Sequence, residues 1–202
     1  MAIPGAASSE QAWTQVEPGR EWGELGAEAK HERILCAAGS LFASHGLDAP
    51  MPAVAALAGA GVGSVYRQFP SKRELLAALV IRRLEQIRAA ADEAAMQESD
   101  HWQALTDMMW KLLEQQAADD FLGQAWSQVE EHEQVQVAAT ASRAALDRLI
   151  SLARVEGSVR EDASALDIRL MFVAAQASRQ VGPDAWQRVF ALMLDGLVAT
   201  RP

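Results

Sequence analysis

The stretch GAGVGSVYRQFPSK, residues 59–72, places three glycines at alternating positions ahead of a tyrosine, an arginine and a lysine. Two kinds of site use such a pattern: a glycine-rich loop that holds a nucleotide phosphate, and a turn that presents a helix to DNA. A dinucleotide fingerprint needs G-x-G-x-x-G directly after a strand, and a P-loop needs a following G-K-S or G-K-T. Here the glycines run G-x-G-x-G after the alanine-rich segment MPAVAALA. We therefore interpret the stretch as a helix-turn-helix, whose small residues let the second helix approach the major groove.

The spacing of apolar residues predicts the helices that position this stretch. Ser71 and Glu74 form the sequence pattern of a capping box, which predicts the start of a long helix. In the helix before it, the spacing predicts that Val62, Val65 and Phe69 are buried. No segment alternates as a strand would, so the fold class is all-α. The predicted helices span 27–45, 52–58, 62–69, 71–95, 101–117, 121–133, 136–154, 164–180 and 183–200.

The net charge of -9 argues against a nucleic-acid partner, but the charge is unevenly distributed. Residues 28–83 carry seven basic and four acidic side chains, which give them a charge of +3. The residues after them carry ten basic and nineteen acidic side chains. A mildly basic segment attached to an acidic body is the asymmetry expected when only one part of a chain contacts phosphate.

An enzyme would need a catalytic constellation, and the four scattered histidines provide none. Glu28-x-x-His31 has the spacing of one half of a di-iron site, without a second copy. Residues 130–133 could hold a metal only by bending a helix. We expect neither an enzyme, a metal nor a cofactor. The single cysteine, Cys36, excludes an internal disulfide, and the absence of a membrane span or signal peptide favours a cytoplasmic protein with no membrane partner.

A set of short segments around the turn occurs in a specific order: Arg33-Ile34-Leu35, Ala37-Ala38, Leu41-Phe42, Val54-Ala55, Ala58-Gly59, Gly63-Ser64-Val65-Tyr66, Phe69-Pro70-Ser71-Lys72 and Leu75-Leu76. With these segments the chain resembles the tetracycline-repressor (TetR) family of one-component regulators. Residues 157–162 and 186–197 resemble the family more loosely. The resemblance implies a three-helix helix-turn-helix domain joined by a long helix to a helical domain for ligand binding and dimerisation. We expect a flexible extension over 1–26, a DNA-binding domain over 27–72 and the helical domain over 73–202.

The resemblance also implies a homodimer whose recognition helices enter successive major grooves of a near-palindromic, double-stranded DNA operator. Tyr66 and Lys72 would then contact phosphates. Val62 either touches a thymine methyl group or is buried against the preceding helix. Met51-Pro52 stand where the family commonly has a serine or threonine that contacts phosphate. The predicted DNA-binding residues are Val62, Gly63, Ser64, Tyr66, Arg67, Gln68 and Lys72.

In the family, the helical domain binds a small-molecule inducer. Large apolar residues on two neighbouring helices are candidates for such a pocket, although they could equally form the core: Trp102, Leu105, Met109, Trp110, Leu113, Phe121, Trp126 and Val129. Lys111 is the main basic residue among them, which favours a neutral or cationic lipophilic ligand over an anionic one.

The last helix is apolar over so much of its circumference that it must bury two sides. One side would pack on its own subunit, and the other would form a four-helix dimer interface with the preceding helix. The predicted interface residues are Ala174, Ala175, Ser178, Trp186, Phe190, Met193 and Leu197. The prediction that results is a ligand-responsive repressor. The alternative is a TetR-like sensor or protein-interaction module without specific DNA binding.

Overall fold

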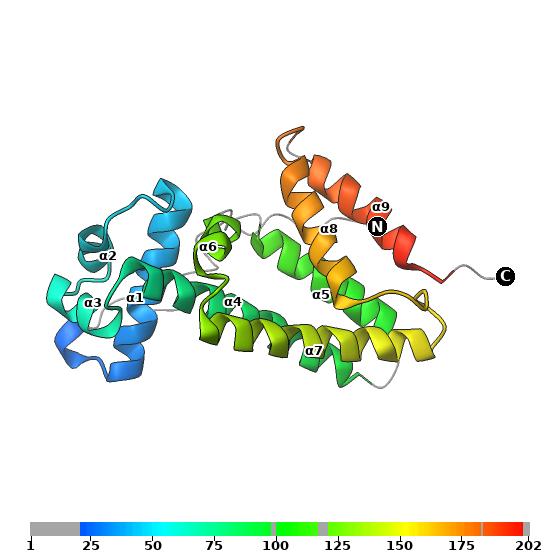
Figure 1. The fold of residues 1–202 in the computed structure, drawn as a ribbon, viewed down its shortest axis with the longest axis horizontal. Helices are drawn as coiled ribbons and strands as arrows, with labels where there is room; N and C mark the ends of the chain where they lie inside the picture. The colour runs from blue at the N-terminus through cyan, green and yellow to red at the C-terminus, as the bar shows by residue number, and fades with distance from the viewer. Residues whose placement is uncertain (1–20, 98–99, 117–120, 183, 200–202) are drawn as a thin grey trace. The chain divides into compact units, whose positions relative to one another are not determined.

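The computed structural model of the chain describes residues 21–97, 100–116, 121–182 and 184–199. Within these residues the chain forms a short 3-10 helix and nine α-helices, and no β-strand (Figure 1). The predicted all-α fold class is confirmed. Across the same residues, no helix is both long enough and apolar enough to span a membrane. The elements are η2 (Trp22–Glu24), α1 (Ala27–His45), α2 (Met51–Leu57), α3 (Val62–Gln68), α4 (Lys72–Ala95), α5 (His101–Gln116), α6 (Phe121–Val129), α7 (Glu133–Val155), α8 (Ala165–Ser178) and α9 (Ala185–Leu197).

The described residues form two compact units. The first unit lies within 1–83 and 114–136, and the second within 84–113 and 137–202. Helices α4, α5 and α7 each contribute residues to both units. The predicted division at residue 72 concerns function rather than packing, so it stays a prediction. Most of the predicted extension over 1–26 lies outside the described residues.

The core of the first unit is built from the apolar faces of α1 to α4, because each of these helices is too short or too polar to be stable alone. Ile34, Val54, Val65 and Leu75 are fully buried in it. Helix α6 joins this core through an aromatic contact, since the ring centroids of Phe42 and Phe121 lie 6.0 Å apart.

The helix ends of the first unit follow the predicted signals. The amide of Gly46 donates to the carbonyl of Phe42 at 2.9 Å and ends α1, with Gly46 at a φ of 74°. At the start of α4, the Ser71 hydroxyl accepts a hydrogen bond from the Glu74 amide at 3.2 Å. The Glu74 carboxylate contacts His132 Nε2 at 3.3 Å. The hydroxyl half of the predicted capping box is therefore present, while the carboxylate half reaches the segment that begins α7.

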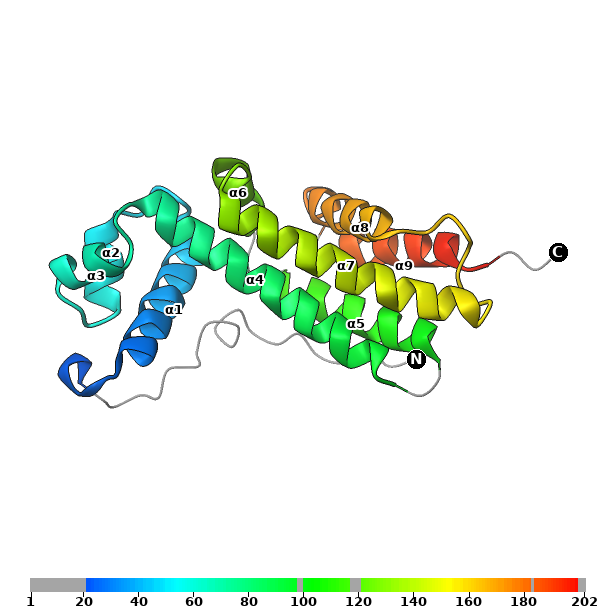
Figure 2. The same cartoon turned by 60° about the horizontal axis from the view of Figure 1, so that its bottom comes forward.

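The core of the second unit lies between α5, α7, α8 and α9. Leu105, Met109, Leu149 and Phe190 are fully buried there. Helices α8 and α9 lie side by side in both ribbon views (Figures 1 and 2). In the same unit, an ion pair between Arg148 and Asp92 connects α7 to α4.

Two predicted helix ends are wrong by a few residues, for local reasons. Helix α6 ends at Val129 rather than at 133, because the His132 amide donates to the Val129 carbonyl at 2.8 Å and forms a turn before α7. Helix α9 ends at Leu197 rather than at 200. There Val198 is extended and forms a single bridge with Val159, so its neighbours hydrogen-bond to the segment before α8 instead of continuing the helix.

Candidate nucleic-acid interface

The turn between α2 and α3 depends on one of the three glycines. Gly59 has a φ of 66°, in the left-handed region that favours glycine. The amide of Ala60 donates to the carbonyl of Ala55 at 2.9 Å, and the amide of Gly59 donates to the carbonyl of Ala56 at 3.2 Å. This pair of bonds is a Schellman motif, which ends α2 and turns the chain toward α3. The predicted helix-turn-helix is confirmed, because a helix and not a strand precedes the glycines.

The other two glycines have ordinary backbone angles. Gly61 precedes α3 with a φ of -68° and a ψ of 140°. Gly63 lies within α3, and a Cβ atom added to it would meet no other atom within 4 Å. Neither the backbone conformation nor the packing of the protein therefore requires glycine at position 63.

One side of α3 packs on the first unit and the other side is exposed. Val65 is fully buried, whereas Val62 is 41% exposed and Tyr66 is 43% exposed. Residues four apart share a helix face, which places Val62 and Tyr66 together. The prediction that α3 buries Val62 is wrong. Val62 is the first residue of the helix and lies at the edge of the buried face, about 60° around the axis from Val65.

The polar residues of α3 lie beside this exposed pair. The Arg67 guanidinium donates from Nη2 to the Ser64 hydroxyl at 2.8 Å. This bond holds an exposed guanidinium on the side of α3 that faces away from the core. Gly63 is exposed as well, while Gln68 is half-buried at the last position of the helix. The structure thus brings the predicted residues of α3 together on one surface, with Gln68 at its margin.

Lys72 begins α4 immediately after this surface. Its ammonium lies 5.6 Å from the centroid of the Phe42 ring. A cation over an aromatic face is attracted by the ring quadrupole, which limits where the half-buried lysine side chain points. The next residue, Arg73, is exposed and was not among the predicted contacts. Two positively charged residues, Lys72 and Arg73, therefore follow the helix-turn-helix directly in the sequence.

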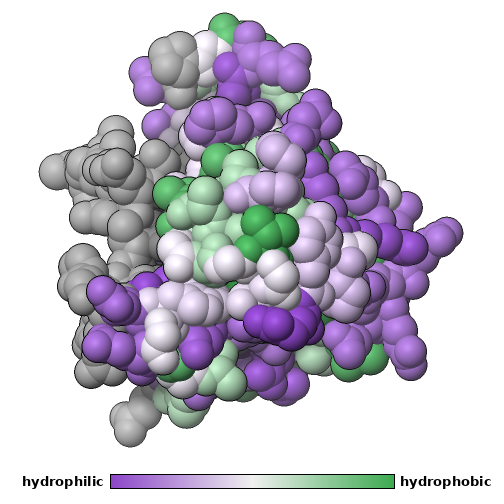
Figure 3. All heavy atoms as spheres, turned by 90° about the vertical axis from the view of Figure 1, so that its left-hand side faces the viewer, coloured by the Kyte–Doolittle hydropathy of each residue, from purple (hydrophilic) through white to green (hydrophobic). Residues whose placement is uncertain are grey.

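The surface of the first unit that carries α2 and α3 has an apolar area bordered by hydrophilic residues (Figure 3). The large apolar side chains that α2 and α3 expose are Leu57, Val62 and Tyr66. Figure 3 shows that this surface of the first unit combines hydrophobic and hydrophilic residues.

The predicted ligand-binding residues fall in both compact units. Phe121, Trp126 and Val129 lie on α6 in the first unit. The other five lie on α5 in the second unit: Leu105, Met109 and Leu113 are fully buried, and Trp102 and Trp110 are partly buried. The ring centroid of Trp110 lies 4.9 Å from that of Phe190 and 6.3 Å from that of Trp186. The assignment of these residues to a ligand stays a prediction.

The predicted dimer residues include several that the chain buries by itself. Ala175, Phe190 and Leu197 belong to the core of the second unit, and Ala174, Ser178, Trp186 and Met193 are half-buried. The exposed apolar side chains of α8 are three others that sequence reasoning missed, Leu166, Leu170 and Val173. Their spacing of four and three residues puts them on one face of the helix, a signal visible in the sequence. Leu192 of α9 is exposed as well.

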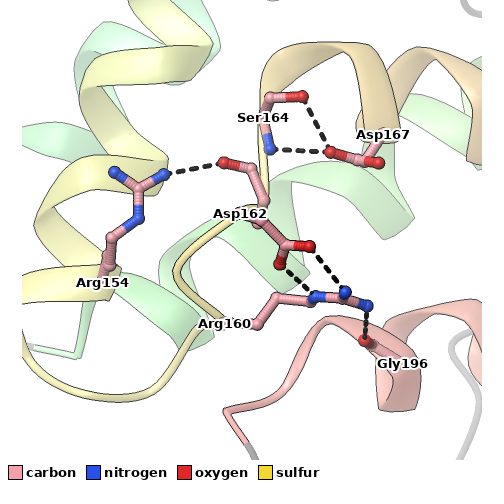
Figure 4. Close-up of polar contacts among 7 residues, drawn as sticks. Arg154, Arg160, Asp162, Ser164, Asp167 and Gly196 are labelled. Carbon is pink, nitrogen blue, oxygen red and sulfur yellow. Dashed lines mark hydrogen bonds and ion pairs between the residues drawn. The ribbon is translucent and has the colours of Figure 1, made fainter.

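A cluster of polar contacts joins the end of α9 to the segment between α7 and α8 (Figure 4). Arg160 pairs with Asp162 through Nε at 2.5 Å and Nη2 at 2.7 Å, and its Nη1 reaches the carbonyl of Gly196 at 3.4 Å. The hydrogen bond from Arg160 holds the pKa of Asp162 below its ordinary value. Ser164 and Asp167 form a full capping box at the start of α8. These contacts set the start of α8 and the end of α9.

The two histidine motifs considered for metal binding make other contacts. The His31 ring packs on Phe69, with centroids 4.9 Å apart, and His132 contacts Glu74 as described above. Among the described residues, no group of three or more histidine, cysteine, aspartate or glutamate side chains is placed to hold a metal ion.

Comparisons with known proteins agree with this geometry. A family model described as bacterial regulatory proteins, tetR family, matches residues 34–79. A second model, described as transcriptional regulator SbtR-like, C-terminal domain, matches residues 100–199. The transcriptional repressor KstR of Mycolicibacterium smegmatis is 42% identical over 93 residues, which are 44% of this chain and 46% of KstR. The chain thus matches about half the length of this curated relative.

Two solved structures extend the likeness over most of the chain. A TetR transcription regulatory protein from Mycobacterium vanbaalenii is 31% identical with a TM-score of 0.60, over 85% of this chain and 96% of that chain. SmeT of Stenotrophomonas maltophilia, in a structure described as its complex with triclosan, is 23% identical with a TM-score of 0.61, over 83% of this chain and 89% of that chain. At that identity the likeness to SmeT concerns the fold alone.

The helical fold and the exposed face of α3 define a helix-turn-helix DNA-binding protein. More specifically, the chain belongs to the TetR family of bacterial regulatory proteins. It is accordingly a DNA-binding transcriptional regulator and not an enzyme.

Proposed function

We propose that the chain is a homodimeric repressor that binds a near-palindromic operator and leaves it when a small lipophilic inducer binds. The exposed face of α3 carries this proposal, because it combines an accessible backbone at Gly63 with the guanidinium of Arg67 and the phenol of Tyr66. DNA binding is assigned to residues 27–72, and ligand binding and dimerisation to 73–202. Repression is favoured because the relative KstR is a repressor. Such a protein would act in the cytoplasm, where bacterial DNA lies.

In this proposal α3 lies in the major groove. Arg67, which is held by its bond to Ser64, would donate to guanine, and Gln68 would pair with adenine. Tyr66 and Lys72 would donate to phosphates. Phosphate contacts fix the register of the protein, whereas contacts to base edges supply the sequence preference.

The dimer forms through α8 and α9. Leu166, Leu170 and Val173 give α8 an exposed apolar face, and Leu192 adds to it from α9. The buried members of the predicted interface, such as Ala175, pack in the core of the second unit and not on this exposed face. Two copies joined face to face would form a four-helix interface. The two recognition helices must then lie about 34–36 Å apart to fit successive major grooves.

The inducer is proposed to bind in the helical region around α5, where the aromatic side chains of Trp102 and Trp110 are partly buried. Such surroundings suit a lipophilic molecule held by few polar contacts. Lys111 is exposed, so the region offers little to bind an anion. Triclosan, with which the fold neighbour SmeT is described, is a compound to include in a first screen.

One observation favours the alternative, a sensor without specific DNA binding. The residue that begins α2 is Met51, and its side chain is buried and carries no hydroxyl. Helix α2 therefore lacks a phosphate contact at this position, which lowers the DNA affinity expected of the helix-turn-helix.

The experiment that separates the two proposals is a titration of the full-length chain against the DNA immediately upstream of its own coding region. A scrambled duplex of the same composition serves as the control, and both titrations are repeated over a range of salt concentrations. The proposal predicts tight binding to one near-palindromic segment that weakens as salt rises. Equal affinity for the two duplexes would support the sensor instead. So would the absence of binding to either duplex, provided that selection from random sequence also yields no duplex that the chain prefers.

A further inference from the structure

Val62 is an apolar side chain that the protein leaves exposed at the start of α3, within the proposed DNA-binding surface. It is 41% exposed, although the next turn of the same helix buries Val65 completely. A valine can neither donate nor accept a hydrogen bond, so it contributes nothing to phosphate binding. At the edges of base pairs in the major groove, the apolar group available to it is the 5-methyl of thymine.

The residues on either side leave Val62 unobstructed. Gly61 and Gly63 both lack side chains, and a Cβ atom at Gly63 would meet nothing within 4 Å. Glycine is a poor helix former, and nothing in the protein's own packing explains its presence inside α3. An external surface that closely approaches this turn of α3 does explain it. The same approach would bring the valine methyl groups against the floor of a groove.

The neighbouring side chains indicate that this external surface is DNA rather than another protein. Tyr66 shares the face of Val62, and the exposed guanidinium of Arg67 lies next to it. The apolar area in Figure 3 is accordingly bordered by hydrophilic groups. In such an arrangement the apolar side chain contacts a thymine methyl group, while the phenol and the cation beside it bind phosphate and guanine.

We propose that Val62 reads the 5-methyl group of a thymine in each operator half-site. This inference rests on the proposed function, because it requires α3 to lie in the major groove. The preferred base opposite the start of α3 is then thymine. It is recognised by its methyl group and not by the hydrogen-bonding groups of the A·T pair. Removal of the methyl group alone should therefore weaken binding.

The test uses a duplex recovered from a random library by selection with the full-length chain. Each thymine is replaced in turn by deoxyuridine, which removes the methyl group and preserves base pairing. At one position in each half-site, the substitution should weaken binding by about fourfold, and by about fifteenfold when both half-sites are changed. In Val62→Ala the same substitutions should have little effect. Leu57→Ala, which shortens an exposed apolar side chain on α2, should keep the sensitivity of the wild type.

Thermal melting followed by circular dichroism establishes that the variants are folded, as expected for exposed positions. The inference is overturned if no thymine is sensitive to loss of its methyl group, or if Val62→Ala keeps the full sensitivity. Selection that yields no preferred sequence would overturn the proposed function and this inference with it. A preferred sequence without methyl sensitivity would overturn the inference alone.

Discussion

Both compact units expose apolar side chains, but the residues that surround these side chains differ between the units. On α3 of the first unit, Val62 and Tyr66 lie beside the cation of Arg67. On α8 of the second unit, Leu166, Leu170 and Val173 form a row of three large exposed apolar residues, and the exposed Arg169 lies at the margin of this row. Exposed apolar area alone therefore does not identify a partner. The two surfaces differ in how many large apolar residues they gather, and in our proposal the partner is DNA for α3 and a second copy of the chain for α8.

The largest expected effect is on the α8 face. Leu170→Arg would bury a cation without a partner, which costs about 3–5 kcal/mol, so the dissociation constant of the dimer should rise by roughly a hundredfold or more. Sedimentation velocity over a range of protein concentrations measures this constant. Val137→Arg on α7, where the wild-type valine is 66% exposed, is the matched control and should leave the dimer intact. Equal dissociation constants for the two variants would assign the dimer interface to another surface.

The next effect concerns the cations around α3. In Lys72→Ala, affinity for DNA should fall by about tenfold for each protomer, because each protomer loses a hydrogen bond to a charged group. The slope of log affinity against log salt should also become shallower by about 0.9 for each phosphate contact removed. Fluorescence anisotropy at several salt concentrations gives both quantities. Arg88→Ala, which removes an exposed cation farther along α4, should change neither. An unchanged salt slope in Lys72→Ala would mean that this lysine does not contact phosphate.

The smallest effect concerns a polar contact that holds the second unit. His101 donates its amide to Glu156 at 2.9 Å, and its Nδ1 lies 2.5 Å from the other carboxylate oxygen. The hydrogen bond from the His101 side chain lowers the pKa of Glu156 from its ordinary value of 4.5. A carboxylate whose pKa is depressed by folding stabilises the protein above its unfolded pKa, and this stabilisation is lost as the pH falls through the lower folded pKa.

Glu156→Gln should therefore be less stable than the wild type at neutral pH. The difference should shrink as the pH falls below about 4.5 and vanish in stronger acid. Urea unfolding at a series of pH values measures it. A stability difference that stays constant from neutral pH to strong acid would show that the Glu156 carboxylate makes no charge-dependent contribution.

Much of the fold can be predicted from local signals. Gly46 and Gly59 end helices at positive φ, and the Ser71 hydroxyl caps α4. These signals act within a few residues, so the sequence shows them directly. The predicted residues of α3 also form one surface, because the helical period alone decides which residues share a face.

Other features depend on contacts between distant residues. The Glu74 carboxylate contacts His132, and Arg160 reaches the carbonyl of Gly196, although neither pair has a recognisable spacing. Whether Val62 is exposed depends on the rotation of α3 about its own axis relative to α2. The helical period alone does not fix this rotation to better than about 60°. The same limit explains why the predicted dimer face included Phe190, which the chain buries in its own core.

The most direct test of the α3 face is the paired measurement of stability and DNA affinity in Gly63→Ala. An added Cβ atom meets nothing in the protein, and alanine is favoured over glycine in a helix by about 1 kcal/mol, so the melting temperature should rise. If α3 approaches DNA at this glycine, affinity for the selected duplex should fall while the salt slope stays the same. A rise in stability with unchanged DNA affinity would contradict the account and would show that DNA does not approach this part of α3.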